Sequence, residues 1–430
     1  MADLRPFRGY RYDLGTVGAL SSVIAPPYDV IDPPLAAQLL SASPFNAVRV
    51  ELTKDLSGGR DKYEVAANTL KDWIDRGAVR QDTARSLYVY EQEFNVEGQT
   101  HTRRGFLARC RLEPFGAGKV YPHEQTMSGP KQDRLNLYRA TGFNLSPVFG
   151  LYPDDDGSVF AILDRLVRRQ PPIEATDHLG VVNRLWVATD QQAIAAVMGA
   201  MGPKPVYIAD GHHRYETGCR YADELRAAGE LDDPEAPANF TLMMLVGMSD
   251  PGLLILPTHR LVSGLPSLSI EQVCSLLEPE FDLLSQYDNA AECWQDVELD
   301  GTQSCLGFGT VADGRWQVAR LRDDTAMARL AADRSTDWRS LGVSILHTLV
   351  LEEKLKRAFG TTGTCRYVHL LSEVTEDVAA QGCQLACLVP PATMGHVERI
   401  AGHGETMPAK STYFYPKLLT GMVFHSLRKE

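Results

Sequence analysis

The chain has 430 residues, of which 44% are apolar and 23% are charged, and its formal net charge is −12. This composition is that of a folded globular protein, which excludes the disordered and fibrous classes. The acidic balance also argues against a protein that coats nucleic acid, because such proteins need a broad basic face. At about 150 residues per domain, the length predicts two or three domains.

No segment has the pattern of a targeting peptide or of a membrane span. The first seven residues lack the apolar stretch of a signal peptide. The most apolar segments, Thr241–Met248 and Leu341–Leu351, are far shorter than the roughly 20 residues of a transmembrane helix. The eight cysteines are dispersed, unlike a secreted disulfide framework, and predict buried free thiols. We therefore expect a cytoplasmic protein without a membrane segment.

The N-terminal part of the sequence changes between the periods of strands and helices. In chain order it predicts an irregular segment at Ala25–Ile31, where two prolines exclude a helix, a strand at Val48–Leu52, a helix over Ala66–Ile74, and a hairpin of Leu87–Phe94 with Gly105–Leu112. The segment His123–Arg134 follows, rich in acids, bases and hydroxyls around a Gly-Pro turn. Such a composition predicts a loop that closes over a substrate.

The middle of the chain carries the most chemistry. A strand at Leu185–Ala188 and a helix over Gln191–Met201 precede a short apolar run, Val206–Ala209, which predicts a buried strand. That strand leads directly into Asp210-Gly211-His212-His213-Arg214, and helical spacing of apolar residues follows from Tyr215. The pattern therefore predicts a strand, a glycine turn and a helix in immediate succession.

The remaining sequence alternates strands and helices. It predicts strands at Thr241–Met248, Leu253–Pro257, 307–308, 316–321 and 384–389, and helices near Ile270–Leu284, 338–358 and 393–400. This alternation predicts an α/β or α+β fold with a mixed sheet and flanking helices. We place a domain boundary near residue 265, which divides the chain into parts 1–265 and 266–430.

The predicted turn at Gly211 has the features of an anion site. A helix N-terminus offers unpaired N–H donors and the positive end of the helix dipole, and Gly211 permits close approach of a ligand to the backbone. His212 and His213 add donors, and we expect the Arg214 guanidinium to face an open pocket and grip a phosphate. Asp210 would repel bare phosphate, so helix capping or Mg²⁺ binding is its expected role. The alternative is a capped helix with surface histidines.

Six motifs in this order resemble one known family. They are Arg5–Gly9, Ala25–Val30, Asn46–Leu52, His123–Arg134, Asp210–Tyr215 and Pro408–Lys417. The family is domain-of-unknown-function family 1015, a bacterial and archaeal group. Gly211–Arg214 is also similar to the phosphate-binding motif of sulfiredoxin and, more loosely, to the Gly-Glu-Arg-Arg box of ParB, a superfamily that includes free serine kinases. The resemblance implies a ParB/sulfiredoxin-like nucleotide-binding part in 1–265 and a C-terminal α+β part in 266–430.

The function that this resemblance implies is a small-molecule kinase acting on free L-serine or a similar hydroxylated metabolite, with Mg²⁺ and ATP, ADP or another nucleotide. In such a site Asp29 and Glu124 are candidates for the carboxylate that orients or deprotonates the acceptor hydroxyl. Four cations are candidates for neutralising charge or holding substrate: Lys131, Arg134, Lys410 and Lys417. Two alternatives stay open, a non-catalytic nucleotide-binding regulator of ParB-like type and a phosphatase or nucleotidase.

Overall fold

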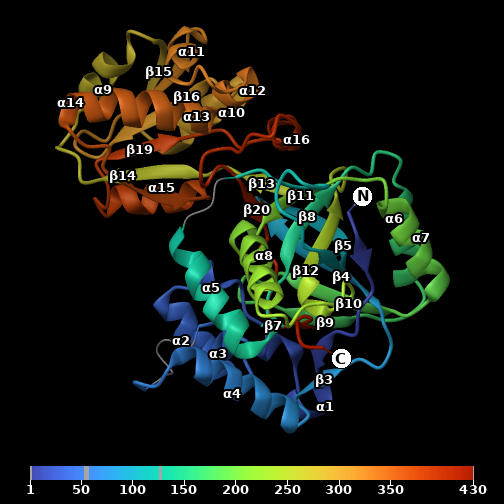
Figure 1. The fold of residues 1–430 in the computed structure, drawn as a ribbon. Helices are drawn as coiled ribbons and strands as arrows, with labels where there is room; N and C mark the ends of the chain where they lie inside the picture. Colours follow the sequence, from blue (N-terminus) through green and yellow to red (C-terminus); the bar gives the residue numbers. More distant parts are fainter. Residues whose placement is uncertain (1, 53–57, 125–127, 430) are drawn as a thin grey trace. The chain divides into compact units, whose positions relative to one another are not determined.

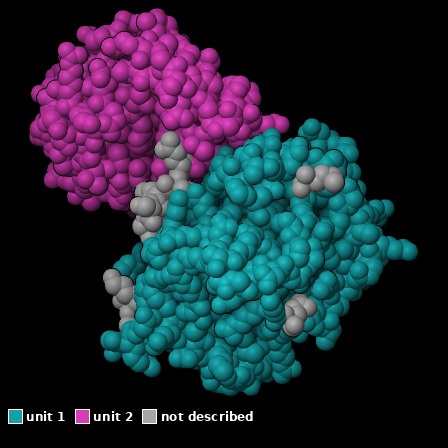
Figure 2. Space-filling view, viewed as in Figure 1, with its two compact units in different colours: residues 1–122, 126–254, 416–430 teal, residues 123–125, 255–415 magenta. Residues whose placement is uncertain are grey.

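The structure is a computed structural model that describes residues 2–52, 58–124 and 128–429. The chain forms two compact units (Figure 2). Unit 1 contains residues 1–122, 126–254 and 416–430, and unit 2 contains residues 123–125 and 255–415. The predicted parts, 1–265 and 266–430, have the same order as these units. They differ because residues 255–265 and 123–125 belong to unit 2 and the last segment of the chain returns to unit 1.

Unit 1 is built on a nine-stranded sheet in the order β6-β11-β8-β12-β5-β4-β10-β9, with β1 beside β5 (Figure 1). The strands are β1 (Leu4–Arg5), β4 (Leu87–Val96), β5 (Gln99–Arg111), β6 (Val120–Pro122), β8 (Val148–Tyr152), β9 (Ile173–Thr176), β10 (Val182–Ala188), β11 (Val206–Asp210) and β12 (Phe240–Gly247). The pairs β6–β11 and β8–β12 are parallel, whereas β4–β5 and β5–β12 are antiparallel. The predicted mixed sheet is therefore confirmed.

Unit 1 contains two groups of helices. Buried residues of α5 (Ser128–Thr141), α6 (Ser158–Val167), α7 (Gln191–Met201) and α8 (His212–Ala227) contribute to the apolar core of the sheet, whereas α2 (Pro33–Ala42), α3 (Val48–Glu51) and α4 (Lys62–Asp75) form a chain of contacts from α2 through α3 and α4 to α5. Buried residues of α6, α7 and α8 share one apolar cluster with β5, β8 and β12. Helix α5 lies beside α8 (Figure 1). The helices predicted over Ala66–Ile74 and Gln191–Met201 and the helix after Gly211 are confirmed by α4, α7 and α8.

The strand predicted at Val48–Leu52 is wrong, because this segment forms the helix α3. The side chain of Asn46 turns the chain there: its Oδ1 accepts the Val48 N–H at 3.0 Å. Its Nδ2 donates to the carbonyls of Ser22 and Ile24 at 2.9 and 3.1 Å. These contacts come from a distant part of the chain, so the local alternation of apolar and polar residues does not decide the structure.

The loop predicted over His123–Arg134 is also wrong in its second half. Helix α5 begins at Ser128, so Lys131 and Arg134 lie on a helix. Residues 125–127 lie outside the described residues. A start at Ser128 makes Pro130 a residue of the first helical turn, where proline is tolerated because its missing N–H has no helical partner.

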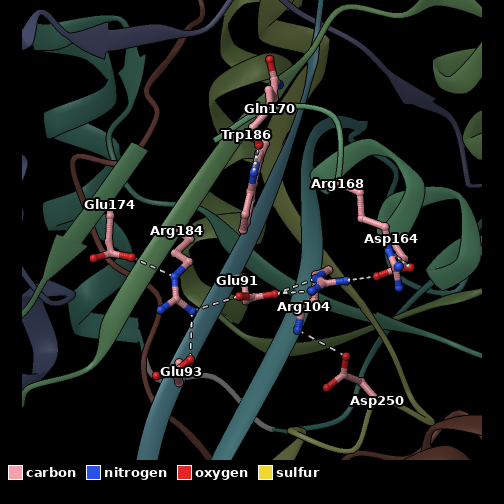
Figure 3. A network of polar contacts seen from close by, with 10 residues as sticks. All are labelled: Glu91, Glu93, Arg104, Asp164, Arg168, Gln170, Glu174, Arg184, Trp186 and Asp250. Atoms are coloured by element: carbon pink, nitrogen blue, oxygen red, sulfur yellow. Dashed lines mark hydrogen bonds and ion pairs between the residues drawn. The ribbon is translucent and has the colours of Figure 1, made fainter. Parts of the chain in front are cut away.

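A row of alternating charges crosses four strands of unit 1 (Figure 3). Glu174, Arg184, Glu91 and Arg104 are successive register partners on β9, β10, β4 and β5. Glu91 is 5% exposed and accepts hydrogen bonds from Arg104 Nε at 2.7 Å and Arg184 Nη1 at 3.2 Å. Arg104 Nη1 continues to Asp164 of α6 at 3.0 Å. This charged row therefore ties α6 to the sheet.

We predict that Glu91→Gln lowers the free energy of unfolding by about 1–3 kcal/mol, because two guanidinium groups lose a nearly buried carboxylate. Urea denaturation measures the effect. Glu93→Gln is the matched control: Glu93 also contacts Arg184, but its side chain is 39% exposed, so a change within about 0.5 kcal/mol is expected. Equal losses in the two variants would contradict a special role for the buried carboxylate.

Unit 2 has a separate six-stranded sheet in the order β15-β17-β16-β19-β14-β18, with antiparallel pairs throughout. Its strands are β14 (His259–Ser263), β15 (Phe281–Tyr287), β16 (Cys305–Thr310), β17 (Trp316–Leu321), β18 (Thr364–Val368) and β19 (Leu385–Leu388). Helices α10 (Ala290–Asp300) and α15 (Leu371–Ala379) pack on this sheet and bury one apolar cluster with it.

The helix predicted near Ile270–Leu284 is wrong in its second half, because α9 covers only Ile270–Leu277. Pro279 cannot continue a helix, and β15 starts at Phe281 with alternating burial. The long helix predicted over 338–358 is present mainly as continuous helical turns from Gly342 to Phe359. Within residues 2–52, 58–124 and 128–429, no helix combines the length and apolar character that crossing a membrane requires.

Candidate functional site

The predicted strand, glycine turn and helix are present in unit 1. Strand β11 ends at Asp210, and Gly211 has φ 84° as the N-cap of the 16-residue helix α8. The N-cap has no side-chain hydrogen bond and the first turn of α8 has no acidic residue, so the helix N-terminus lacks the usual negative partners. This backbone angle favours glycine, and a Cβ at Gly211 would lie 2.9 Å from Arg214 Nε, so it would displace the guanidinium.

Asp210 lies at the centre of several positive charges. Arg214 Nη2 and Lys417 Nζ approach the same carboxylate oxygen, Oδ2, at 3.1 and 3.7 Å. Burial alone would raise the pKa of Asp210, but the charges of Lys417, Arg214 and His212 outweigh it and hold this pKa well below its ordinary value. The register of β11 against β8 shifts between Ile208 and Asp210, an irregularity of the kind that re-aims side chains beside functional sites.

Arg214 does not face an open pocket, which corrects the expectation from the sequence. Its side chain is 5% exposed, and its guanidinium donates to the Pro147 carbonyl and to Asp210. Burial would lower the pKa of Arg214, but Asp210 and Asp29 raise it above its ordinary value. Arg214 therefore fixes the position of the Gly211 turn and of Asp210 through these two hydrogen bonds. His212 is buried and His213 is half-buried at the start of the same helix.

The irregular segment that contains Asp29 belongs to the same charge cluster. The chain makes a short 3₁₀ turn over Tyr28–Val30, which leaves Asp29 exposed. The Arg134 guanidinium lies 4.1 Å from the centre of the Tyr28 ring. Burial, followed by the charge of Asp29, raises the pKa of Tyr28 to about 12, while Arg134 and Arg214 oppose this rise. The structure thus brings Asp29, Arg134 and Arg214 together.

Arg134 and Lys131 of α5 are engaged with carboxylates. Arg134 is buried and donates to Glu51 Oε1 at 3.1 Å and to Asp133 Oδ2. Lys131 Nζ lies 2.7 Å from Glu216 Oε2 of α8. These contacts fix α5 against α3 and α8. Glu51 was not singled out by the sequence, although it lies in one of the six family motifs.

Glu124 and Lys410 belong to unit 2, whereas Asp210 belongs to unit 1. The Lys410 N–H donates to Glu124 Oε1 at 2.6 Å, and the Lys410 carbonyl accepts from Arg260 Nη2 at 2.7 Å. Lys410 has φ 61°, a conformation that costs about 1–2 kcal/mol for a residue with a Cβ. The side chains of Glu124 and Arg260 therefore hold the backbone of Lys410 in a strained conformation. Glu124 and Lys410 thus contact each other within unit 2.

The potential metal ligands and the thiols of the described residues are arranged as follows. Over 2–52, 58–124 and 128–429, no group of three or more His, Cys, Asp or Glu side chains is arranged to hold a metal ion. All eight cysteines are free thiols, and six of them are buried, as predicted; Cys219 and Cys365 are partly exposed.

Several solved structures resemble the chain at a low level. A conserved hypothetical protein from Pyrococcus furiosus is 12% identical with a TM-score of 0.34, over 70% of this chain and 89% of that one. A free serine kinase in complex with AMP is 12% identical with a TM-score of 0.33, over 69% and 83% of the two chains. SbnI with a C-terminal truncation, from Staphylococcus aureus, is 11% identical with a TM-score of 0.33, over 73% and 85%. TM-scores this low carry no argument about fold or function.

The sequence comparison is more decisive. No curated protein matches the chain. The profile of a family described as protein of unknown function (DUF1015) matches residues 4–344, which is most of the chain. Five of the six motifs lie inside this match, and only Pro408–Lys417 lies beyond it. The chain therefore belongs to the DUF1015 family.

Proposed function

We propose that unit 1 binds the phosphate groups of a nucleotide at the N-terminus of α8 and transfers a phosphoryl group to a small hydroxylated metabolite, such as free L-serine. The observation that carries this proposal is the N-terminus of α8, which has no acidic residue in its first turn and lies beside two cationic side chains, Arg214 and Lys417. Both cations are paired with Asp210, so a bound phosphate would share them with this carboxylate. Such a setting favours a polyanion. The same motif supports a ParB/sulfiredoxin-like assignment for this part of the fold.

The proposed roles follow from burial. The Gly211 turn offers backbone donors to phosphate, with His212 and His213 beside it, and the half-buried Lys417 neutralises charge. Arg214 is a positioning residue, because its donors face Asp210 and the Pro147 carbonyl. Asp29 is the candidate base, since an exposed carboxylate can accept a proton from an acceptor hydroxyl.

Mg²⁺ is proposed here only as part of a nucleotide complex, because the candidate ligand Asp210 is paired with Arg214 and Lys417. Mg²⁺ takes six oxygen ligands and is usually held by one or two carboxylates together with phosphate oxygens and water. Asp210 would supply the protein ligand, and the ion would neutralise charge on the phosphates. Roles for Lys131, Arg134, Glu124 and Lys410 in charge neutralisation or catalysis stay predictions. For Lys131 and Arg134 any such role must compete with Glu216 and Glu51.

A thermal-shift titration of the full chain with ATP, ADP and CTP, each with and without Mg²⁺, tests nucleotide binding. A ligand at 100 times its Kd stabilises the fold by about 2.7 kcal/mol. We expect Lys417→Met to weaken binding about ten- to a hundredfold, because one charge-assisted contact is lost. Lys204→Met is the matched control: Lys204 is similarly shielded, but it contacts Pro153 and Asp154. No shift with any nucleotide would refute the proposal.

Product analysis then separates the kinase from its alternatives. A kinase yields a phosphorylated metabolite when L-serine and related hydroxylated compounds are supplied with the nucleotide that binds. A phosphatase or nucleotidase releases free phosphate without an acceptor. A regulator of ParB-like type binds nucleotide without either product. Only the first outcome supports the proposed reaction.

A further inference from the structure

Three buried polar side chains form a second row across the sheet of unit 1. Asn183, Gln92 and Arg103 are register partners on β10, β4 and β5, and all three are fully buried. Each follows or precedes a member of the charged row by one residue, so this row lies on the opposite face of the sheet. Buried polar groups are costly unless their hydrogen bonds are satisfied, so the partners of this row indicate its purpose.

Those partners are carbonyl groups of the C-terminal segment that returns to unit 1. Arg103 Nη2 donates to Gln92 Oε1 and to the Pro416 carbonyl, each at 2.5 Å. Gln92 Nε2 donates to the Lys417 carbonyl and to Asn183 Oδ1, each at 3.2 Å. Two consecutive carbonyls, those of Pro416 and Lys417, are thus held by side chains from the middle of the sheet.

The same segment is held again three residues later. Ala25 and Thr420 exchange two backbone hydrogen bonds, at 3.1 and 2.8 Å. Ala25 begins the irregular segment that leads to Asp29. The chain from Pro416 to Thr420 is therefore fixed at both ends, on one side by the buried row and on the other by the segment that carries the candidate base.

We propose that Gln92 and Arg103 are positioning residues that fix the Lys417 backbone so that its ammonium group lies beside Asp210. A lysine side chain is long and flexible, so its direction depends on how its backbone is held. In the structure the Lys417 Nζ lies 3.7 Å from Asp210 Oδ2, and the Lys417 side chain is only 12% exposed. Arg103 also contributes to the setting directly: its guanidinium lies 4.8 Å from the centre of the Phe149 ring, and Phe149 pairs in register with Asp210. The role of this ammonium group in neutralising phosphate rests on the proposed function, whereas its positioning by Gln92 and Arg103 does not.

The test measures the accessibility of the Lys417 amine without any nucleotide. Full-length protein is treated with limiting acetic anhydride, and acetylation of Lys417 is followed by peptide mass spectrometry relative to Lys204, an internal reference in the same unit. We expect Gln92→Met to increase the relative rate of Lys417 severalfold, because the Lys417 carbonyl loses its donor. Asn183→Ala is the control: Asn183 belongs to the same buried row, and its side chain forms hydrogen bonds with Tyr90, Gln92 and Val181.

A second variant covers the case in which Gln92→Met does not fold. Gln92→Glu keeps the side-chain shape and an acceptor for Arg103, but it cannot donate to the Lys417 carbonyl. A rate for Lys417 that stays at the wild-type value in the folded Gln92 variants would overturn the proposal. So would an equal increase in Asn183→Ala, because general loosening of the sheet would then explain both. Failure to bind nucleotide would refute the proposed function and leave this result unaffected.

Discussion

Replacing Arg214 by methionine is expected to lower the free energy of unfolding by about 3–5 kcal/mol, because the change breaks a buried ion pair and leaves one partner behind. Asp210 would lose the guanidinium at 3.1 Å, and the Pro147 carbonyl would lose its donor. Urea denaturation with a folding probe such as circular dichroism measures the loss. Calorimetric titration of the folded variant should show weaker nucleotide binding, since Asp210 and the Gly211 turn depend on Arg214.

Arg220→Met is the matched control on the same helix. Arg220 is 54% exposed and only approaches Glu224 at 3.5 Å, so its loss should change stability by at most about 0.5 kcal/mol. Arg214→Lys should recover part of the stability, because an ammonium group keeps the charge without the two-sided fork of the guanidinium. A stability of Arg214→Met equal to the wild type would show that Arg214 does not hold the turn.

The elements next to the candidate site were predictable because their signals are local. The apolar run Val206–Ala209, the glycine and the helical spacing that follows all lie within about two dozen residues, and the structure confirms each of them. The hairpin of β4 and β5 is confirmed for the same reason: Glu97 and Gly98 both have positive φ, as a two-residue turn between strands requires. Local spacing is thus sufficient where the sequence supplies its own turn residues.

The sequence does not reveal hydrogen bonds between residues that are far apart along the chain. Nothing in the strand around Gln92 and Arg103 indicates that their acceptors lie 325 and 313 residues away. The contact between Glu124 and Lys410 spans 286 residues. The positive charge of Arg214 is evident from the sequence, but its hydrogen bond to the Pro147 carbonyl, 67 residues earlier, is not. The sequence therefore named many charged residues near the Gly211 turn, but it did not reveal which of them are buried or which protein groups they contact.

The second large effect is expected for Asp210→Asn, which removes the carboxylate that Arg214 and Lys417 share. The amide keeps the shape of the side chain but removes the carboxylate that pairs directly with the buried guanidinium, so the free energy of unfolding should fall by about 3 kcal/mol at pH 7. Asp250→Asn is the control, because the pKa shift of Asp250 has the opposite sign: burial raises it, so the charged form of Asp250 is disfavoured in the fold. That variant should lose less stability at pH 7, or gain some.

The pH dependence of the Asp210→Asn loss follows from the low pKa of the carboxyl group. A carboxyl group whose pKa in the folded protein lies below its ordinary value of 3.8 contributes stability that is fully present above that value. The contribution disappears as the pH falls through the folded-state pKa. The difference between wild type and Asp210→Asn should therefore be constant from pH 7 to pH 5 and smaller at pH 3. The double variant that combines Asp210→Asn with Arg214→Met should lose less free energy of unfolding than the sum of the two single losses, because each substitution removes the same ion pair. Additive losses, or a difference that grows toward low pH, would contradict the assigned pairing of Asp210 with Arg214.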